Sequence, residues 1–217
     1  DNVEKVYLPH AVDPTFFKPI DEEQIKEIKK NHNLENKFVF FWNNRNARRK
    51  MSGSLIYWFR DFCDRVGHDK ATLIMHTDPN DPYGQPLEHI LGHFGLNQGQ
   101  ILLSRNKVSP DQLSALYNMA DCTINISDAE GFGLATLESL SCETPIIATM
   151  TGGLQEQITD GENWFGIGIE PSSKALIGSQ QVPYIYEDRI SKEDFVEALV
   201  KMYEMSQEER KNLGAMG

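Results

Sequence analysis

Long hydrophobic runs are missing from this 217-residue sequence, and none approaches the eighteen or so residues that a membrane-spanning helix needs. The first ten residues, DNVEKVYLPH, also lack the apolar stretch of a signal peptide. Cysteine is scarce, and the three that occur, Cys63, Cys122 and Cys142, lie far apart inside apolar stretches without metal-ligand spacing. We therefore expect buried, reduced thiols rather than catalytic or disulfide-bonded ones, in a cytoplasmic protein.

Positive charge is also scarce, because 21 Lys and Arg face 32 Asp and Glu, for a formal net charge of −11. Such a surface argues against nucleic acid as a partner and gives no indication of binding to an anionic membrane. The distribution is uneven, since there is no acidic residue between Asn36 and Arg60. The basic residues of this stretch are Lys37, Arg45, Arg48, Arg49, Lys50 and Arg60. The pattern favours an anion-binding site there, with a solvated basic turn as the alternative.

Apolar, β-rich runs alternate with helical patterns along the chain. Strands are predicted at 37–42, 71–77, 100–104, 122–127 and 144–149, and helices at 52–67, 87–95, 109–120 and from about 134. The helix at 109–120 has a clear start signal, with Ser109 as N-cap, Pro110 at the first helical position and Gln112 closing a capping box. About five strand–helix units with continuous apolar strands predict an α/β domain with a doubly wound parallel sheet, Rossmann-like in class.

Two segments lie outside this alternation. Residues 1–20 form an extended, turn-rich lead-in, and we place the domain itself at 21–217. Residues 171–190 form a long connection without clear periodicity, of a length that is often functional or mobile. Neither end of the sequence resembles a natural terminus, so we expect a domain from a longer protein.

A basic loop follows the first predicted strand. Ligands of parallel α/β sheets bind beyond the carboxyl ends of the strands, so the loops at that edge are the place to search. Arg45 and Lys50 come directly after the strand at 37–42. An arginine fork and a lysine point charge together suit a diphosphate.

A second loop at the same edge, SDAEGFGLATLE (127–138), combines acids with a Gly-Phe-Gly turn. Gly131 and Gly133 would let a ligand approach the backbone, and a helix beginning at Gly133 or directly after it would direct free N–H groups at a phosphate. Glu130 and Glu138 could accept hydrogen bonds from the vicinal hydroxyls of a ribose or a hexose. Spacing alone leaves open a simple turn with a solvated carboxylate.

The stretch EGFGLATLESLSCETPIIATMTGGLQEQITDG (130–161) resembles the signature of retaining glycosyltransferases of the two-domain GT-B type, in the large family four (glycosyl transferases group 1). The hallmark of that family is a pair of glutamates separated by seven residues, which Glu130 and Glu138 match. Three other pieces resemble the family in the expected order: LPHAVDPTFFKP (8–19), FWNNRNARRK (41–50) and SPDQLSALYNMADCTINIS (109–127). The resemblance covers most of residues 1–165 and is loose over the last fifty.

The resemblance implies a role for each matching residue. Arg45 and Lys50 would hold the diphosphate of a nucleotide-sugar donor. Glu138 would accept hydrogen bonds from the ribose hydroxyls, and Glu130 would act at the transferred sugar and the reacting centre. The backbone that would line the sugar and phosphate site is that of Gly131, Phe132, Gly133 and Leu134. The segment RNKV (105–108) would lie near the nucleotide base.

The resemblance also implies a retaining, metal-independent transfer that needs no cofactor, and no Asp-x-Asp pair is placed to carry a metal ion. Family members have an amino-terminal acceptor domain that would precede this chain, so the chain alone should bind donor and transfer nothing efficiently. Three residues depart from the family pattern. Ala11 and Glu143 stand where glycine is frequent, and Trp164 stands where a glycine would commonly close a turn.

Several alternatives remain open. A nucleotide-sugar epimerase or a sugar phosphorylase of the same fold is one, although no pyridoxal-binding lysine stands out for a phosphorylase. A non-catalytic nucleotide- or sugar-sensing module is another, and it would keep Arg45 and Lys50 but tolerate loss of Glu130. His89 and His93 are four residues apart on a predicted helix, but they lack the order of a zinc-protease motif and an evident third ligand, so we interpret them as structural.

Overall fold

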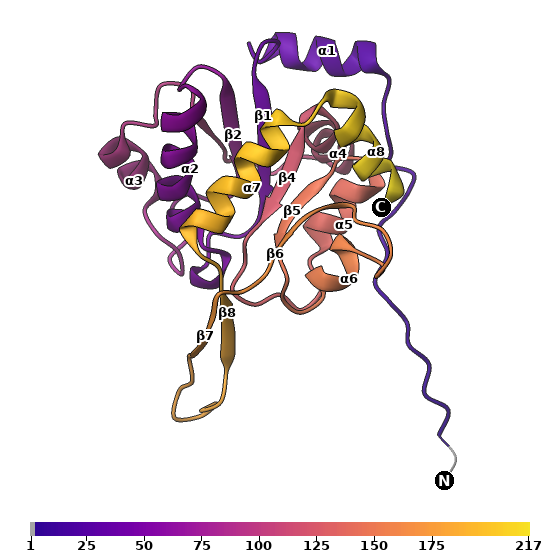
Figure 1. Ribbon diagram of the computed structural model, residues 1–217, viewed down its shortest axis with the longest axis vertical. Coiled ribbons are helices and arrows are strands. Elements are labelled where there is room, and N and C mark those ends of the chain that lie inside the picture. Colours follow the sequence, from indigo (N-terminus) through magenta and orange to yellow (C-terminus); the bar gives the residue numbers. More distant parts are fainter. Residues whose placement is uncertain (1–2) are drawn as a thin grey trace.

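The computed structural model of the chain describes residues 3–217 and contains a six-stranded, fully parallel sheet (Figure 1). The strands lie in the order β3-β2-β1-β4-β5-β6. Their bounds are β1 (Phe38–Asn43), β2 (Ala71–His76), β3 (Ile101–Ser104), β4 (Cys122–Asn125), β5 (Ile146–Thr149) and β6 (Gly166–Ile169). The predicted doubly wound, Rossmann-like sheet is confirmed, and the strand order reverses direction between β1 and β4.

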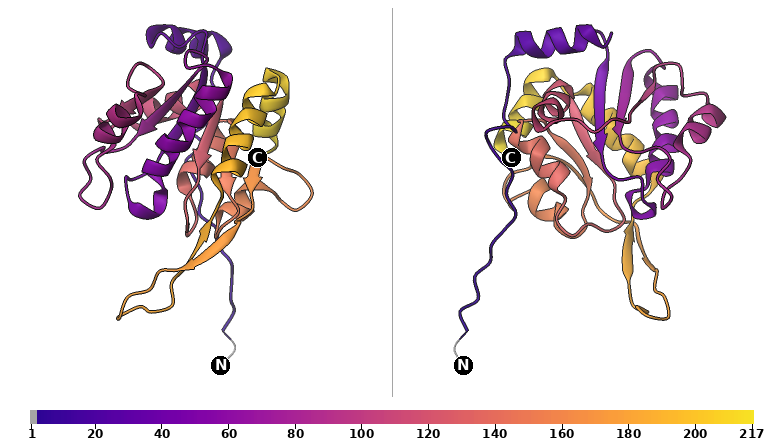
Figure 2. Two further views of the ribbon diagram at one scale, coloured as in Figure 1. Left: turned by 60° about the vertical axis from the view of Figure 1, so that its left-hand side comes forward. Right: turned by 180° about the vertical axis from the view of Figure 1, so that it is seen from behind.

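Helices cover both faces of this sheet (Figures 1 and 2). They are α1 (Glu22–Asn31), α2 (Ser52–Val66), α3 (Leu87–Phe94), α4 (Pro110–Met119), α5 (Leu134–Ser141), α6 (Leu154–Ile158), α7 (Lys192–Glu204) and α8 (Gln207–Met216). The helices α2, α3 and α7 contribute to one core, and α4 and α5 to the other side. Among residues 3–217, none of these helices combines the length and the apolarity needed to cross a membrane.

The central strand β1 shows why the apolar runs are continuous. Phe38, Phe40 and Trp42 point to the core shared with α2 and α7, and the alternate residues Val39 and Phe41 pack against α4 on the other face. Since a strand alternates its side chains between the two faces, burial on both sides requires an apolar residue at every position. This burial orders the strand whose carboxyl end carries the basic loop.

The predicted start of α4 is present in detail. The Ser109 hydroxyl accepts from the Gln112 backbone N–H at 3.3 Å, and the Gln112 side chain accepts from the Ser109 N–H at 3.0 Å. The helix α7 has a similar cap, in which the Ser191 hydroxyl accepts from the Asp194 N–H at 3.0 Å. Each cap satisfies N–H groups that a helix start leaves without intrahelical partners.

Glu143 occupies a left-handed position between α5 and β5, with φ of 57°. This is the conformation that glycine adopts without steric cost, which explains why glycine is frequent there in the family that the sequence resembles. At another departure from the family pattern, the turn before Trp164 is formed around Asp160, whose carboxylate accepts from the backbone N–H groups of Glu162 and Asn163 at 2.9 and 2.7 Å. Gly161 supplies the positive φ of 95° in that turn, so no glycine is needed at Trp164.

The connection at 171–190 contains a β-hairpin that the sequence pattern did not reveal. Its antiparallel strands are β7 (Ser173–Leu176) and β8 (Tyr186–Arg189), which pair only with each other. The hairpin extends from the carboxyl edge of the main sheet and away from the body of the molecule (Figures 1 and 2).

Candidate functional site

The loops after β1 and β4 meet at the point where the strand order of the sheet reverses. The strand β1 pairs with β2 on one side and with β4 on the other, so these two loops leave the sheet in neighbouring positions. The Asp128 N–H donates to the Arg49 carbonyl at 2.8 Å and holds the two loops together. Open parallel sheets bind ligands in the crevice at such a switch point.

Lys50 and Glu130 face each other across this junction. Lys50 ends a short 3₁₀ turn, Arg48–Lys50, and its ammonium donates to the Glu130 carboxylate. Both side chains are largely buried, with about a tenth of each exposed. The Ser127 hydroxyl also donates to Glu130 at 3.3 Å, and the Arg49 guanidinium lies 3.5 Å from the same carboxylate. The sequence places these two groups eighty residues apart, and the fold makes them an ion pair.

The charge of this pair reflects a balance between burial and neighbouring cations. Burial raises the pKa of the Glu130 carboxyl, but the hydrogen bond from Lys50 and the charges of Lys50 and Arg49 outweigh it and hold the pKa below its ordinary value of 4.5. Burial lowers the pKa of Lys50, and the bond to Glu130 offsets only part of that effect. Glu130 therefore stays ionised at neutral pH, and Lys50 reaches an anion only by sharing or leaving this partner.

Glu138 lies in a separate hydrogen-bonded group. It is on the second turn of α5, which begins at Leu134 with Gly133 as N-cap, one of the two predicted starts. The Tyr117 hydroxyl donates to Glu138 at 2.6 Å and accepts from the Asn43 amide at 2.8 Å. Burial raises the pKa of Glu138 above its ordinary value of 4.5, and the Tyr117 hydrogen bond offsets part of that rise.

Arg45 is not paired with the same groups as Lys50. Its guanidinium donates to the Asp81 carboxylate at 2.6 and 3.2 Å and lies 4.9 Å from the centre of the Tyr83 ring. Its side chain is 60% exposed. The structure therefore places Arg45 against the loop that follows β2, where it is accessible but already has a carboxylate partner.

The Gly-Phe-Gly turn has a structural requirement at its second glycine. Gly133 adopts φ of 93°, and a Cβ there would lie 2.7 Å from the Leu154 side chain, so glycine is needed for the fold itself. At Gly131 a Cβ would meet nothing within 4 Å. The Phe132 carbonyl accepts from the Gln157 amide at 2.6 Å. Leu134 is exposed at the start of α5.

Sequence reasoning missed several residues that support this site. A Cβ on Gly152 would lie 1.8 Å from the Glu130 carbonyl oxygen, so the loop after β5 can approach Glu130 only because glycine stands there. Arg189 on β8 forms an ion pair with Asp128, two residues before Glu130. The adjacent glycines of TMTGG were visible in the sequence, but no local pattern could indicate that Arg189 reaches this loop.

Other sequence candidates lie outside the switch point. His89 and His93 line a cavity of about 430 Å³ between α2 and α3. The neighbouring Glu88 forms an ion pair with Arg105, from the segment expected near a base. Within residues 3–217, no group of three or more His, Cys, Asp and Glu side chains is arranged to hold a metal ion. All three cysteines are buried and free, and burial raises the pKa of Cys63 to about 12.

The arrangement suits a phosphorylated ligand rich in hydroxyl groups. It joins a cluster of cations and a helix start, which favour phosphate, to two glutamates, which can accept from hydroxyls.

The family model for glycosyl transferases group 1 matches residues 23–216, and the chain belongs to this family. The match includes the last fifty residues, where the sequence motifs resembled the family only loosely.

Individual proteins are similar to the chain in sequence or in fold. The chain is 32% identical over 109 residues, half of its length, to the D-inositol 3-phosphate glycosyltransferase of Paenarthrobacter aurescens. It is similar in fold to the C-terminal domain of a glycosyl transferase group 1 family protein from Francisella tularensis, with a TM-score of 0.70 and 21% identity over 94% of this chain and 93% of that one. Anabaena HepE, solved in complex with UDP and glucose, matches 94% of this chain with a TM-score of 0.68 and 17% identity.

The chain is shorter than most of these relatives. The matched segment is 25% of the Paenarthrobacter protein, and the chain spans 48% of the Anabaena protein.

Proposed function

We propose that this chain is the donor-binding half of a retaining glycosyltransferase that moves a sugar from a nucleoside diphosphate sugar to an acceptor. The observation that carries the proposal is the meeting of Lys50, Arg49 and Glu130 at the switch point of a sheet from the glycosyl transferases group 1 family. Anabaena HepE, which shares the fold, was solved with UDP and glucose, and this makes UDP the first nucleotide to test here.

The charges of the site supply the mechanism. Transfer breaks the bond between the anomeric carbon and the diphosphate oxygen, and the electron pair of that bond leaves with the diphosphate. The acceptor hydroxyl forms the new bond to the anomeric carbon, and its proton passes to the departing diphosphate oxygen. Lys50, Arg49 and the free N–H groups at the start of α5 stabilise the charge on the departing diphosphate more in the transition state than in the ground state.

The remaining roles follow from position. Glu138 accepts from the ribose hydroxyls, with Tyr117 fixing its carboxylate through the 2.6 Å hydrogen bond. Glu130 contacts the transferred sugar after Lys50 turns toward the diphosphate. Arg45 adds a third cation once the ligand replaces Asp81 as its partner.

We extend the proposal to the metal requirement, the acceptor site and the cellular location of the enzyme. The reaction needs no metal ion, because the cations named above supply the charge that a metal would bring to the diphosphate. The acceptor site lies in an amino-terminal half that precedes this chain in the full-length protein. The whole enzyme works in the cytoplasm.

Calorimetric titration of the 217-residue chain with UDP, GDP and ADP, without added metal, tests the donor site. We expect one nucleotide to bind, and an Arg45→Ala/Lys50→Ala variant to lose that binding. A Lys26→Ala variant is the matched control, because it removes an exposed cation from α1. Failure of all three nucleotides to bind, or unchanged binding by the double variant, would contradict the proposed site.

A further inference from the structure

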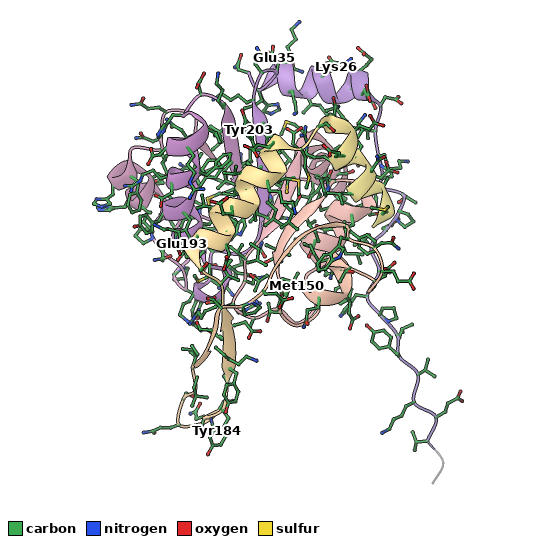
Figure 3. The ribbon with its side chains drawn as sticks, in the orientation of Figure 1. Lys26, Glu35, Met150, Tyr184, Glu193 and Tyr203 are labelled. Atoms are coloured by element: carbon green, nitrogen blue, oxygen red, sulfur yellow. The ribbon has the colours of Figure 1, made fainter. Side chains whose placement is uncertain are left out.

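The hairpin of β7 and β8 carries an exposed apolar tip. The tip, residues 177–185, reads IGSQQVPYI and has no charged residue, in a protein with net charge −11. Exposed apolar side chains occur here and on the adjoining strand ends: Leu176, Val182, Tyr184, Ile185 and Tyr186. Tyr184 is 77% exposed and lies at the far end of the hairpin, away from every other element (Figure 3).

A two-stranded hairpin of this kind gains little stability from its own contacts. Two isolated strands are marginal in water, and a concentrated apolar surface on a soluble domain marks an interaction site. Residues 3–217 provide no cover for this tip, since the strands β7 and β8 pair only with each other.

The root of the hairpin is, by contrast, firmly tied to the candidate site. Glu187 is buried and accepts from both ends of the Arg48 guanidinium, at 2.5 and 2.9 Å. Arg189 forms an ion pair with Asp128, and the Asp188 N–H donates to the Asp128 carbonyl at 2.8 Å. Arg48 is on the loop of Lys50, and Asp128 is on the loop of Glu130. A displacement of the hairpin would therefore be transmitted to both loops of the donor site.

We propose that the tip packs against the amino-terminal half of the full-length protein, and that this contact closes the cleft over the donor. The inference rests on the proposed function in one respect, which is that such a half exists. The Anabaena protein that shares the fold is about twice as long as this chain, which spans 48% of it.

The direction of the chain supports this partner. The lead-in at residues 3–13 and the hairpin extend beyond the same end of the molecule in all three views (Figures 1 and 2). A preceding half attached to the lead-in would lie beyond the carboxyl edge, on the side toward which the tip points. The absence of charge from the tip favours a dry protein contact over an anionic lipid surface, which would select lysine or arginine.

Hydrogen–deuterium exchange followed by mass spectrometry tests the contact directly. We expect peptides covering 177–185 to exchange at least about tenfold more slowly in the full-length protein than in the 217-residue chain. A Val182→Ser/Tyr184→Ser variant of the full-length protein should lose this protection. It should also lower kcat/KM for transfer by about tenfold and weaken UDP binding to the full-length protein, as expected when the anchors of an interface that closes over the donor are removed. The same substitutions in the 217-residue chain, which lacks the amino-terminal half, should leave UDP affinity within about twofold of the parent. Gln181→Ser is the matched control from the same loop and should change none of these quantities.

The outcomes separate this inference from the proposed function. Equal exchange of the tip in the two proteins overturns the contact even if UDP binds. Protection of the tip without binding of any nucleotide supports the contact and contradicts the donor site. Protection of the tip in the isolated chain that grows with protein concentration overturns the proposed partner in favour of a second copy. Protection of the isolated chain that occurs only after addition of phosphatidylserine vesicles overturns it in favour of a membrane. Loss of UDP binding by the tip variant of the isolated 217-residue chain also overturns it, because the hairpin would then act on the donor site itself.

Discussion

A lysine that is proposed to bind a diphosphate is already neutralised in this protein by a buried carboxylate. Lys50 and Glu130 have about a tenth of their side chains exposed, so water screens their attraction only weakly. A phosphate must compete with Glu130 for this cation. Glu130→Gln keeps the shape and the hydrogen-bond acceptor but removes the competing charge. We expect it to tighten UDP binding to the chain by roughly three- to tenfold, equivalent to about 1 kcal/mol for a partly screened pair.

Calorimetry measures the change in UDP affinity, and transfer assays on the full-length protein measure the accompanying change in activity. Since Glu130 is placed at the reacting centre, the same substitution should abolish measurable transfer there although UDP binds more tightly. Glu156→Gln is the control, because it removes one negative charge from an exposed position on α6. Unchanged or weaker UDP affinity in Glu130→Gln would show that Lys50 is not the anion-binding group.

Glu138 gives a prediction about stability and pH. Burial raises its pKa in the folded protein above the ordinary 4.5, so folding favours its protonated form. Its contribution to stability is fully present below pH 4.5 and is lost as pH rises through the folded-state pKa. An amide cannot ionise, so Glu138→Gln escapes this loss. We expect the variant to gain stability relative to the parent between pH 4 and pH 7, by no more than about 1 kcal/mol because Glu138 is partly exposed to solvent.

Urea denaturation at the two pH values measures this difference. Glu208 is an exposed acid on α8, so Glu208→Gln controls for the change in net charge. The difference in stability between this variant and the parent should be the same at both pH values. A Glu138→Gln variant that is less stable than the parent at pH 7 would mean that the hydrogen bond from Tyr117 outweighs burial.

At the scale of secondary-structure elements, two glycines should respond oppositely to the same substitution. Gly166 on β6 faces Ile146 on β5, and a Cβ there would lie 1.9 Å from the Ile146 carbonyl oxygen. Backbone cannot easily move in a paired strand, so Gly166→Ala should destabilise the fold by at least about 2 kcal/mol. Gly92 in α3 has no atom within 4 Å of the same position, and Gly92→Ala should stabilise by up to about 1 kcal/mol through helix propensity.

Urea denaturation of both variants at one pH measures their free energies of unfolding, and each variant serves as the control for the other. A Gly166→Ala variant as stable as the parent would mean that β6 is able to shift away from β5. Because β6 is the edge strand and continues into the hairpin, that result would also weaken the mechanical link proposed between the tip and the donor site.

The elements that sequence reasoning found are those with a strong local signal. The strand of Val39 and Phe41 is apolar on both faces, and the helix capped by Ser109 begins with a complete capping box. The strands β6, β7 and β8 lack such signals. β6 is GIGI, with two glycines that weaken strand propensity. β7 (SKAL) and β8 (YEDR) are four residues each and at least half polar, and Glu187 is their only buried residue. These strands form because of pairing partners, which a local pattern does not contain.

For the candidate site, the sequence predicted which residues lie at the sheet edge but not which side chains pair there. Motif and strand–loop position indicated that Lys50 and Glu130 belong to one edge of the sheet. Their ion pair was not predictable, nor was the contact of Arg45 with Asp81, because each joins loops that are 80 and 36 residues apart in sequence. Which carboxylate takes which cation depends on side-chain geometry after folding.

For the whole molecule, the boundary between lead-in and domain is a question of packing. The sequence suggested a domain at 21–217, but the structure anchors the end of the lead-in to the body. Phe17 is 9% exposed, and its carbonyl accepts from the Ser141 hydroxyl at 2.7 Å. Asn118 holds the next residues, donating to the Lys18 carbonyl at 2.9 Å and accepting from the Ile20 N–H at 3.0 Å.

Earlier residues of the lead-in contribute little by comparison. Tyr7 donates to Glu156 at 2.9 Å, and the His10 ring lies 4.8 Å from that of Phe132, but Tyr7 and His10 are both exposed. Exposed polar contacts of this kind add little to stability, because water competes for the same groups. We therefore expect the physical boundary of the folded unit to lie before Phe17 rather than at residue 21.

Two truncations of the chain test this boundary. A chain of residues 12–217 keeps Phe17 and its hydrogen bonds, and its free energy of unfolding should be within about 0.5 kcal/mol of the parent. A chain of residues 21–217 loses a buried phenylalanine and leaves Asn118 without its partners from the lead-in, which should cost about 2–4 kcal/mol. Urea denaturation at constant pH measures both, and Phe17→Ala in the full 217-residue chain separates the apolar part of the loss from the hydrogen bonds. Equal stability of the two truncations would mean that the lead-in only rests on the domain, and residue 21 would then be the true start of the folded unit.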